Sequence, residues 1–110
     1  MTWTISHGRP NPGGPFDGYH SRGYSQVGEW RDAVLGLGLH LTDRDVVALE
    51  PLLKRRSGDP FSVRPRQAAA IADALLRLLH RMPPAQREMT ETLAAAAERA
   101  AAAGEPWRWS

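Results

Sequence analysis

The segment between His7 and Arg22 carries side chains that can bind a ligand or a metal ion. Two imidazoles and a carboxylate are the smallest set for an open metal site, and a phenol and a guanidinium accompany them here. The residues concerned are His7, Asp17, Tyr19, His20 and Arg22. Their spacing matches no regular metal motif such as HExxH. A solvated loop with polar side chains is therefore the interpretation that we prefer over a metal site.

A second cluster of functional interest is basic. Residues 54–66 contain five cationic side chains and a single acid, Asp59. If the turn at 58–60 folds back, the two ends of this segment meet and the five cations share one corner. This basic corner consists of Lys54, Arg55, Arg56, Arg64 and Arg66. It can contact phosphates or an acidic protein partner. Cations that complement a helix end, together with ordinary surface arginines, would give the same pattern, so both interpretations stay open.

Several chemistries are excluded by the residues that the sequence lacks. There is no cysteine among the 110 residues, which rules out disulfides and thiolate catalysis. Neither a phosphate-binding P-loop nor a GxSxG nucleophile motif occurs. Ser6 and His7 cannot act as a nucleophile and its base, because neighbouring strand residues point to opposite faces. We expect neither a catalytic residue set nor a bound cofactor.

Length and composition indicate one ordinary globular domain spanning residues 1–110. Hydrophobic residues make up 42% and charged residues 24% of the chain. The net charge of +2 is a weak argument for nucleic-acid binding. No apolar run approaches the ~20 residues of a membrane span, and the first residues have no signal-peptide core. We therefore expect a cytoplasmic protein, and the absence of cysteine fits a reducing compartment.

Apolar periodicity predicts four helices. The most regular stripe lies in residues 65–81, so we expect this helix at the centre of the core. Pro83 and Pro84 separate it from the last helix, and Gly104 should end that one. The alternation in residues 35–41 also allows a short strand there, although we prefer a helix end followed by a linker. The expected helices are 25–35, 42–56, 65–81 and 84–103.

The expected helix at 42–56 has the clearest start signal. Thr42 is a typical N-cap, and Asp45 occupies the position of the glutamate in a capping box. Its apolar stripe is predicted to consist of Val46, Leu49 and Leu53. Pro51 lies inside this pattern and should kink or restart the helix, because it removes one backbone donor. A helix-turn-helix with the 65–81 helix is not indicated, since the connection of about eight residues exceeds the usual three to four.

The two ends of the chain have the period-two pattern of strands. Trp3 and Ile5 share one face near the start, as do Trp107 and Trp109 at the end. We expect these segments to pair and to cover the core, rather than to form a stacking platform for a base or sugar ring. Residues 61–63 can add a third strand, and residues 8–23 are predicted to be a long loop rich in glycine and proline. The predicted fold is α+β, with about four helices around 65–81 and a small two- or three-stranded sheet.

Three stretches of the sequence resemble those of small uncharacterised proteins from actinobacteria and their phages. They are TWTISHG at the start, ALEPLLKRRSGDPFSV in the middle and AAAAGEPWRWS at the end. The resemblance spans most of the chain. No activity is established for that group, so the resemblance implies a class of source organism and no chemistry.

Together these features favour a small non-enzymatic binding or regulatory module that acts through a protein partner. The basic corner and the 8–23 loop are the surfaces that we expect to be used. Nucleic-acid binding through the same basic corner is the main alternative. A metal-dependent enzyme that uses the 7–22 segment is a distant one.

Overall fold

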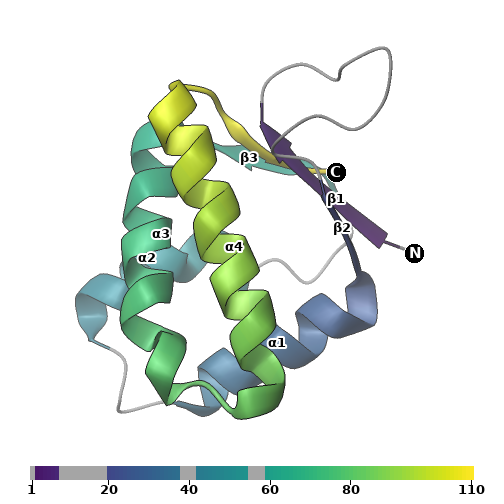
Figure 1. Cartoon of the computed structure of the whole chain (residues 1–110), viewed down its shortest axis with the longest axis vertical. Coiled ribbons are helices and arrows are strands. Elements are labelled where there is room, and N and C mark those ends of the chain that lie inside the picture. The colour runs from purple at the N-terminus through teal and green to yellow at the C-terminus, as the bar shows by residue number, and fades with distance from the viewer. Residues whose placement is uncertain (1, 8–19, 38–41, 55–58) are drawn as a thin grey trace.

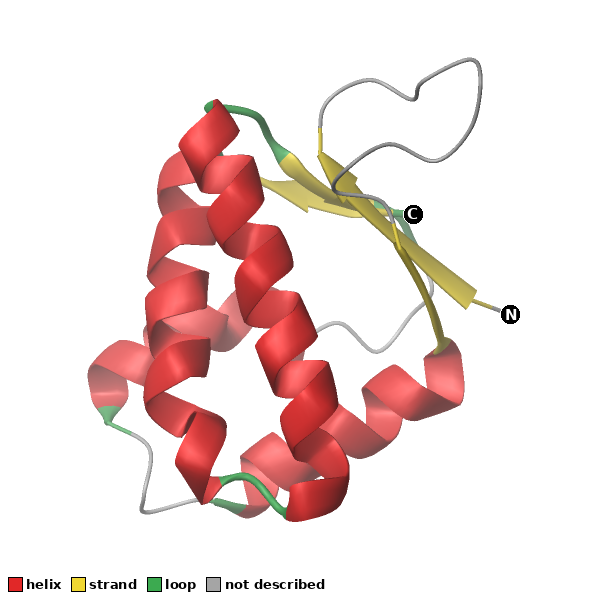
Figure 2. Ribbon diagram, in the orientation of Figure 1, coloured by secondary structure: helices red, strands yellow, loops and turns green. Residues whose placement is uncertain are grey.

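An antiparallel sheet packs beside a set of helices in the computed structural model, which describes residues 2–7, 20–37, 42–54 and 59–110. Within these residues the fold is α+β, as predicted (Figures 1 and 2). None of the described helices is both long enough and apolar enough to cross a lipid bilayer. The elements in chain order are β1 (Thr2–His7), β2 (His20–Gly23), α1 (Tyr24–Gly36), α2 (Asp43–Leu53), β3 (Phe61–Val63), α3 (Pro65–Leu78), the 3-10 turn η2 (Leu79–Arg81), α4 (Pro84–Ala103) and β4 (Trp107–Trp109).

The described strands form a four-stranded sheet in the order β2-β1-β4-β3, with every pair antiparallel. The predicted pairing of the two terminal segments is confirmed. Thr4 and Ser110 exchange two backbone hydrogen bonds of 2.7 and 2.8 Å, which extend the β1–β4 ladder. The predicted third strand at 61–63 is also confirmed. Both ends of the described chain therefore lie on the same side of the molecule (Figure 1).

The fourth strand corrects the prediction of a loop that continues to residue 23. Residues 20–23 pair with β1, with Arg22 opposite Trp3 and His20 opposite Ile5. The sequence of this strand is His-Ser-Arg-Gly, which has neither apolar alternation nor β-branched residues. Its conformation comes from hydrogen bonding to β1 and not from a local preference, so the sequence pattern could not indicate it.

The tryptophans of both ends belong to the core, as expected. Trp3 is 3% exposed, Trp107 is fully buried and Trp109 is 2% exposed. The rings of Trp3 and Trp109 meet edge to face with centroids 5.7 Å apart, and those of Trp107 and Trp109 do so at 5.4 Å. Such edge-to-face contacts add to the large apolar area that each ring buries. Their burial leaves these rings unavailable as an exposed stacking platform.

Helices α3 and α4 lie side by side and supply most of the core that the sheet covers (Figure 1). The predicted central helix is confirmed, with Ile71, Leu75 and Leu78 buried. Alanines dominate the buried face of α4, and small side chains let the two helix backbones approach closely. Gly104 ends α4 with a φ of 67°, a left-handed conformation that glycine adopts without strain.

Helix α1 begins one residue earlier than the predicted start. Gly23 is its N-cap, and the side chain of Gln26 accepts a hydrogen bond of 2.9 Å from the Gly23 backbone N–H. Trp30 is buried and donates through its indole N–H to the hydroxyl of Thr90 on α4 at 2.9 Å. The helix runs through Gly36, which confirms a helix over the first residues of 35–41; residues 38–41 lie outside the described part of the chain.

Helix α2 differs from its prediction in the face that it buries. Thr42 is the N-cap as expected, and its hydroxyl accepts a hydrogen bond from the backbone N–H of Asp45 at 3.2 Å. However, the predicted apolar stripe is partly wrong, because Val46 is 44% exposed. The helix continues through Pro51 and ends earlier than predicted, at Leu53. The residues buried along α2 are Asp45, Leu49 and Leu52.

We predict that Trp109→Ala lowers the free energy of unfolding by about 3–5 kcal/mol, because it opens a cavity where Trp3, Trp107 and Phe61 meet. The matched control is Arg108→Ala, which removes an exposed side chain from the same strand and should change stability by less than about 0.5 kcal/mol. Urea denaturation followed by tryptophan fluorescence measures both. Equal stability losses in the two variants would contradict the assignment of these rings to the core.

Candidate functional site

The residues predicted for a ligand-binding loop are only partly described by the structure. Asp17 and Tyr19 lie outside the described residues. His7 ends β1, and its backbone is opposite Trp107 of β4. His20 begins β2, with its backbone opposite Ile5. The convergence of these residues on a ligand therefore stays a prediction.

The described members of this group make one firm contact. Arg22 donates to the carboxylate of Glu88 on α4 at 2.7 Å, so it links the edge strand β2 to a helix. Both ring nitrogens of His7 are buried and form no hydrogen bond to any residue that the structure describes. Within the described residues, no three histidines or carboxylates lie close enough together to hold a metal ion.

Of the basic corner, the structure describes Lys54, Arg64 and Arg66; Arg55 and Arg56 lie outside the described residues. Lys54 follows the end of α2 and pairs with Glu50 one turn earlier at 3.2 Å. Arg64 is the N-cap of α3, and Arg66 lies in its first turn. The sequence pattern predicted all five cations in one corner. The structure puts Lys54 and Arg66 at two separate hollows, one on each side of Val47.

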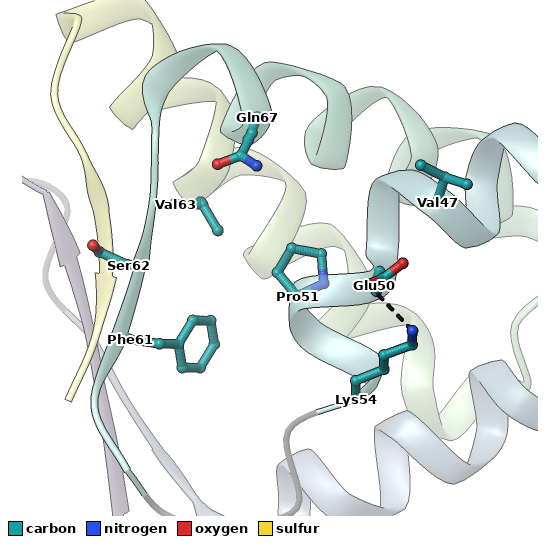
Figure 3. A pocket seen from close by; sticks show the side chains of 8 residues that line it. All are labelled: Val47, Glu50, Pro51, Lys54, Phe61, Ser62, Val63 and Gln67. Carbon is teal, nitrogen blue, oxygen red and sulfur yellow. Dashed lines mark ion pairs between the residues drawn. The ribbon is translucent and has the colours of Figure 1, made fainter.

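The first hollow lies between α2 and the sheet edge β3 and has a volume of about 470 Å³. Figure 3 shows Phe61 of β3 and Pro51 of α2 facing each other across it, with the Lys54–Glu50 ion pair at its rim. Because proline has no N–H, Pro51 cannot donate to the Val47 carbonyl one turn earlier. The hollow is lined by Val47, Glu50, Pro51, Lys54, Phe61, Ser62, Val63 and Gln67.

The second hollow lies between α2 and α3 and has a volume of about 390 Å³. Its apolar lining comes from Val47 and Ala48 of α2 and Ala70 of α3. Three arginines and a single carboxylate, Asp73, complete the wall. The arginines are Arg44, Arg66 and Arg77.

Val47 separates the two hollows and is the most exposed of the large apolar side chains that the structure describes, at 68%. Its exposure follows from the orientation of α2. The side chain of Asp45 is only 6% exposed and accepts a hydrogen bond of 2.9 Å from Nε of Arg77 on α3. This ion pair and the burial of Leu49 and Leu52 hold the same side of the helix inward, and Val47 then points outward. We call Val47 and the two hollows beside it the α2 surface.

Sequence patterns indicated two cations of the α2 surface, Lys54 and Arg66, but not its apolar part. Arg44, Val47 and Arg77 gave no distinct signal, because each belongs to an ordinary amphipathic helix. One local signal did indicate an exposed valine. Val46 and Val47 are adjacent, and a helix cannot bury both side chains on one narrow stripe. The hollows themselves were beyond the sequence pattern, since each is built from segments that lie far apart in the chain.

A comparison with protein-family models finds a match to a domain of unknown function, DUF7739, over residues 23–110. The chain belongs to this family. The match includes α1 to α4, β3 and β4, and with them every residue of the α2 surface. Searches of curated proteins and of solved structures find no match. Membership in DUF7739 agrees with the resemblance to an uncharacterised group and assigns no activity.

We predict that Arg77→Ala lowers the free energy of unfolding by about 2–3 kcal/mol, because it leaves the buried carboxylate of Asp45 without a partner. The value is below that of a fully buried pair, since Arg77 is itself 42% exposed. Arg66→Ala is the control: it removes an exposed arginine from the same hollow and should cost less than about 0.5 kcal/mol. Chemical denaturation measures both, and equal losses would show that the ion pair does not hold α2.

Proposed function

We propose that this DUF7739 protein is a small non-enzymatic binding module that acts through a protein partner at the α2 surface. The observation that carries the proposal is the exposure of Val47 between two hollows. Contiguous apolar patches with polar rims mark interaction sites on soluble proteins, and Val47 lies beside Pro51 and Phe61 in one hollow and Ala48 and Ala70 in the other. Arginines are enriched in such interfaces, and Arg44, Arg66 and Arg77 surround one hollow here.

Nucleic-acid binding is the second candidate, and the cations Arg44, Arg64 and Arg66 favour it. The apolar residues that lie near these cations argue against nucleic-acid binding. Val47, Pro51 and Phe61 offer apolar surface, whereas interfaces with DNA are polar and strongly positive. The exposed residues at the start of α3 include alanines at 69 and 70, which cannot read base edges by hydrogen bonding.

The sequence gives no support for an enzyme, since it carries neither a nucleophile motif nor a regular metal motif. A metal-dependent activity of the 7–22 segment is the least favoured function. We propose that the protein acts in the cytoplasm, because the absence of cysteine fits a reducing compartment. An actinobacterial or actinophage source is part of the same proposal and is supported by the resemblance of the three stretches.

We predict that Val47→Glu abolishes capture of the partner from an extract of the source cell. The substitution puts a charge at the centre of the interface without affecting the core, so the melting temperature should stay within a few degrees. Leu35→Glu is the matched control, since Leu35 is 53% exposed on a different helix and should leave capture unchanged. Quantitative mass spectrometry of crosslinked complexes measures the difference. A partner captured equally by both variants would place the binding surface elsewhere.

We predict further that binding to random duplex DNA is weaker than ~100 μM at physiological salt, which is weaker than typical non-specific DNA binding. Fluorescence anisotropy over a series of salt concentrations measures it. If DNA is the true partner, log affinity will fall with log salt by about 0.9 per phosphate contact, and Arg64→Ala with Arg66→Ala will flatten the slope by about 2. Tight, sequence-selective binding that these substitutions remove would contradict the protein-partner proposal.

A further inference from the structure

The charges around the α2 surface are unbalanced. Two of its cations are neutralised within the chain, because Lys54 pairs with Glu50 and Arg77 pairs with Asp45. Three other cations, Arg44, Arg64 and Arg66, form no ion pair with any residue that the structure describes. Asp73 is the one carboxylate left to oppose them in the second hollow, among the residues described there. The surface thus carries a net positive charge that an acidic ligand would neutralise.

These cations lie next to the apolar residues that line the two hollows. Arg44 and Arg66 stand at the wall of the second hollow, and Arg64 directly follows β3, which borders the first. Val47 belongs to the apolar lining of both hollows. Each hollow is more than ten times the ~30 Å³ that a water molecule occupies in the liquid, so each has room for a side chain.

We infer that the segment of the partner that binds the α2 surface is an acidic peptide with two apolar anchor residues. One anchor enters each hollow and covers Val47 from either side. The carboxylates that flank the anchors meet Arg44, Arg64 and Arg66 as charge-assisted hydrogen bonds. A nucleic acid would satisfy the arginines but would lay a charged backbone over Val47 and Phe61. This inference rests on the proposed function and adds the chemistry of the partner to it.

The exposure of the α2 surface also explains why both kinds of contact are needed. Exposed ion pairs contribute little in water, so the three arginines alone would give weak binding that salt removes. Burial of Val47 and of two anchors supplies most of the binding free energy, while the charges select acidic partners and raise the association rate.

Selection of peptides from a phage library of random dodecapeptides against the intact protein tests the inference. We expect the selected peptides to carry several aspartates and glutamates around two apolar residues. Their affinity should fall at least about tenfold for Arg44→Ala with Arg66→Ala, and it should weaken as salt is raised. The matched control is Arg99→Ala with Arg108→Ala, which removes two exposed arginines outside the α2 surface and should leave affinity unchanged. Circular dichroism verifies that each variant is folded.

The outcomes separate this inference from the proposed function. One outcome would overturn the acidic partner and keep the α2 surface. In that outcome the Val47→Glu variant no longer binds the selected peptides, but the peptides have no excess of acidic residues and bind the Arg44→Ala, Arg66→Ala variant as well as the wild type. Selected peptides that bind Val47→Glu as well as the wild type would overturn both. Acidic peptides whose affinity falls equally for the Arg99→Ala, Arg108→Ala control would show that general charge, and not the α2 surface, selects them.

Discussion

The alternation of Trp107, Arg108 and Trp109 along β4 is the constraint on which the rest of the structure depends. This strand of three residues lies between β1 and β3 and joins the first strand of the described chain to its middle. Because side chains alternate, both tryptophans point to the helices while the arginine between them stays outside. The left-handed turn at Gly104 sets the direction in which the chain leaves α4. The last residues of the chain therefore join the strands of the sheet and pack the sheet against the helices.

Elements whose signal is local could be predicted from the sequence. The helices α3 and α4, their separation by Pro83 and Pro84, and the tryptophan-bearing strands all follow from periodicity within a single segment. Strand β2 could not be predicted, because its four residues form a strand only where the edge of β1 offers hydrogen bonds. The buried face of α2 was misjudged for a similar reason. The stripe through Val46 looked equally good, and the residue that decides against it, Arg77, lies 32 positions from Asp45.

The same division applies to the candidate site. Lys54 and Arg66 were visible in the basic cluster of residues 54–66, whereas Arg44, Arg77 and the hollows themselves depend on how α2 packs against β3 and α3. The outer edge of β3, which no described strand covers, adds little to this surface. Thr4 and Ser110 form a hydrogen-bonded pair, so the alternating ladder directs the backbone groups of Phe61 and Val63 toward β4 and only those of Ser62 outward. With Pro60 before it, so short an edge is a poor template for an added strand. The proposed recognition would therefore depend on side chains that enter the hollows.

The orientation of α2 connects the buried core to this surface. A helix turns by about 100° per residue, so Val47 points roughly 200° away from Asp45 and faces outward whenever Asp45 faces α3. Buried ion pairs contribute little stability compared with apolar residues of the same size, because both charges must leave water. What the Asp45–Arg77 pair provides is direction. Leu49 and Leu52 are buried on the same face of α2, and the carboxylate of Asp45 adds a directional contact to them, because it is satisfied only where Arg77 reaches it. The Asp45–Arg77 contact and the two buried leucines thus leave Val47 exposed, on the surface that we propose for a partner.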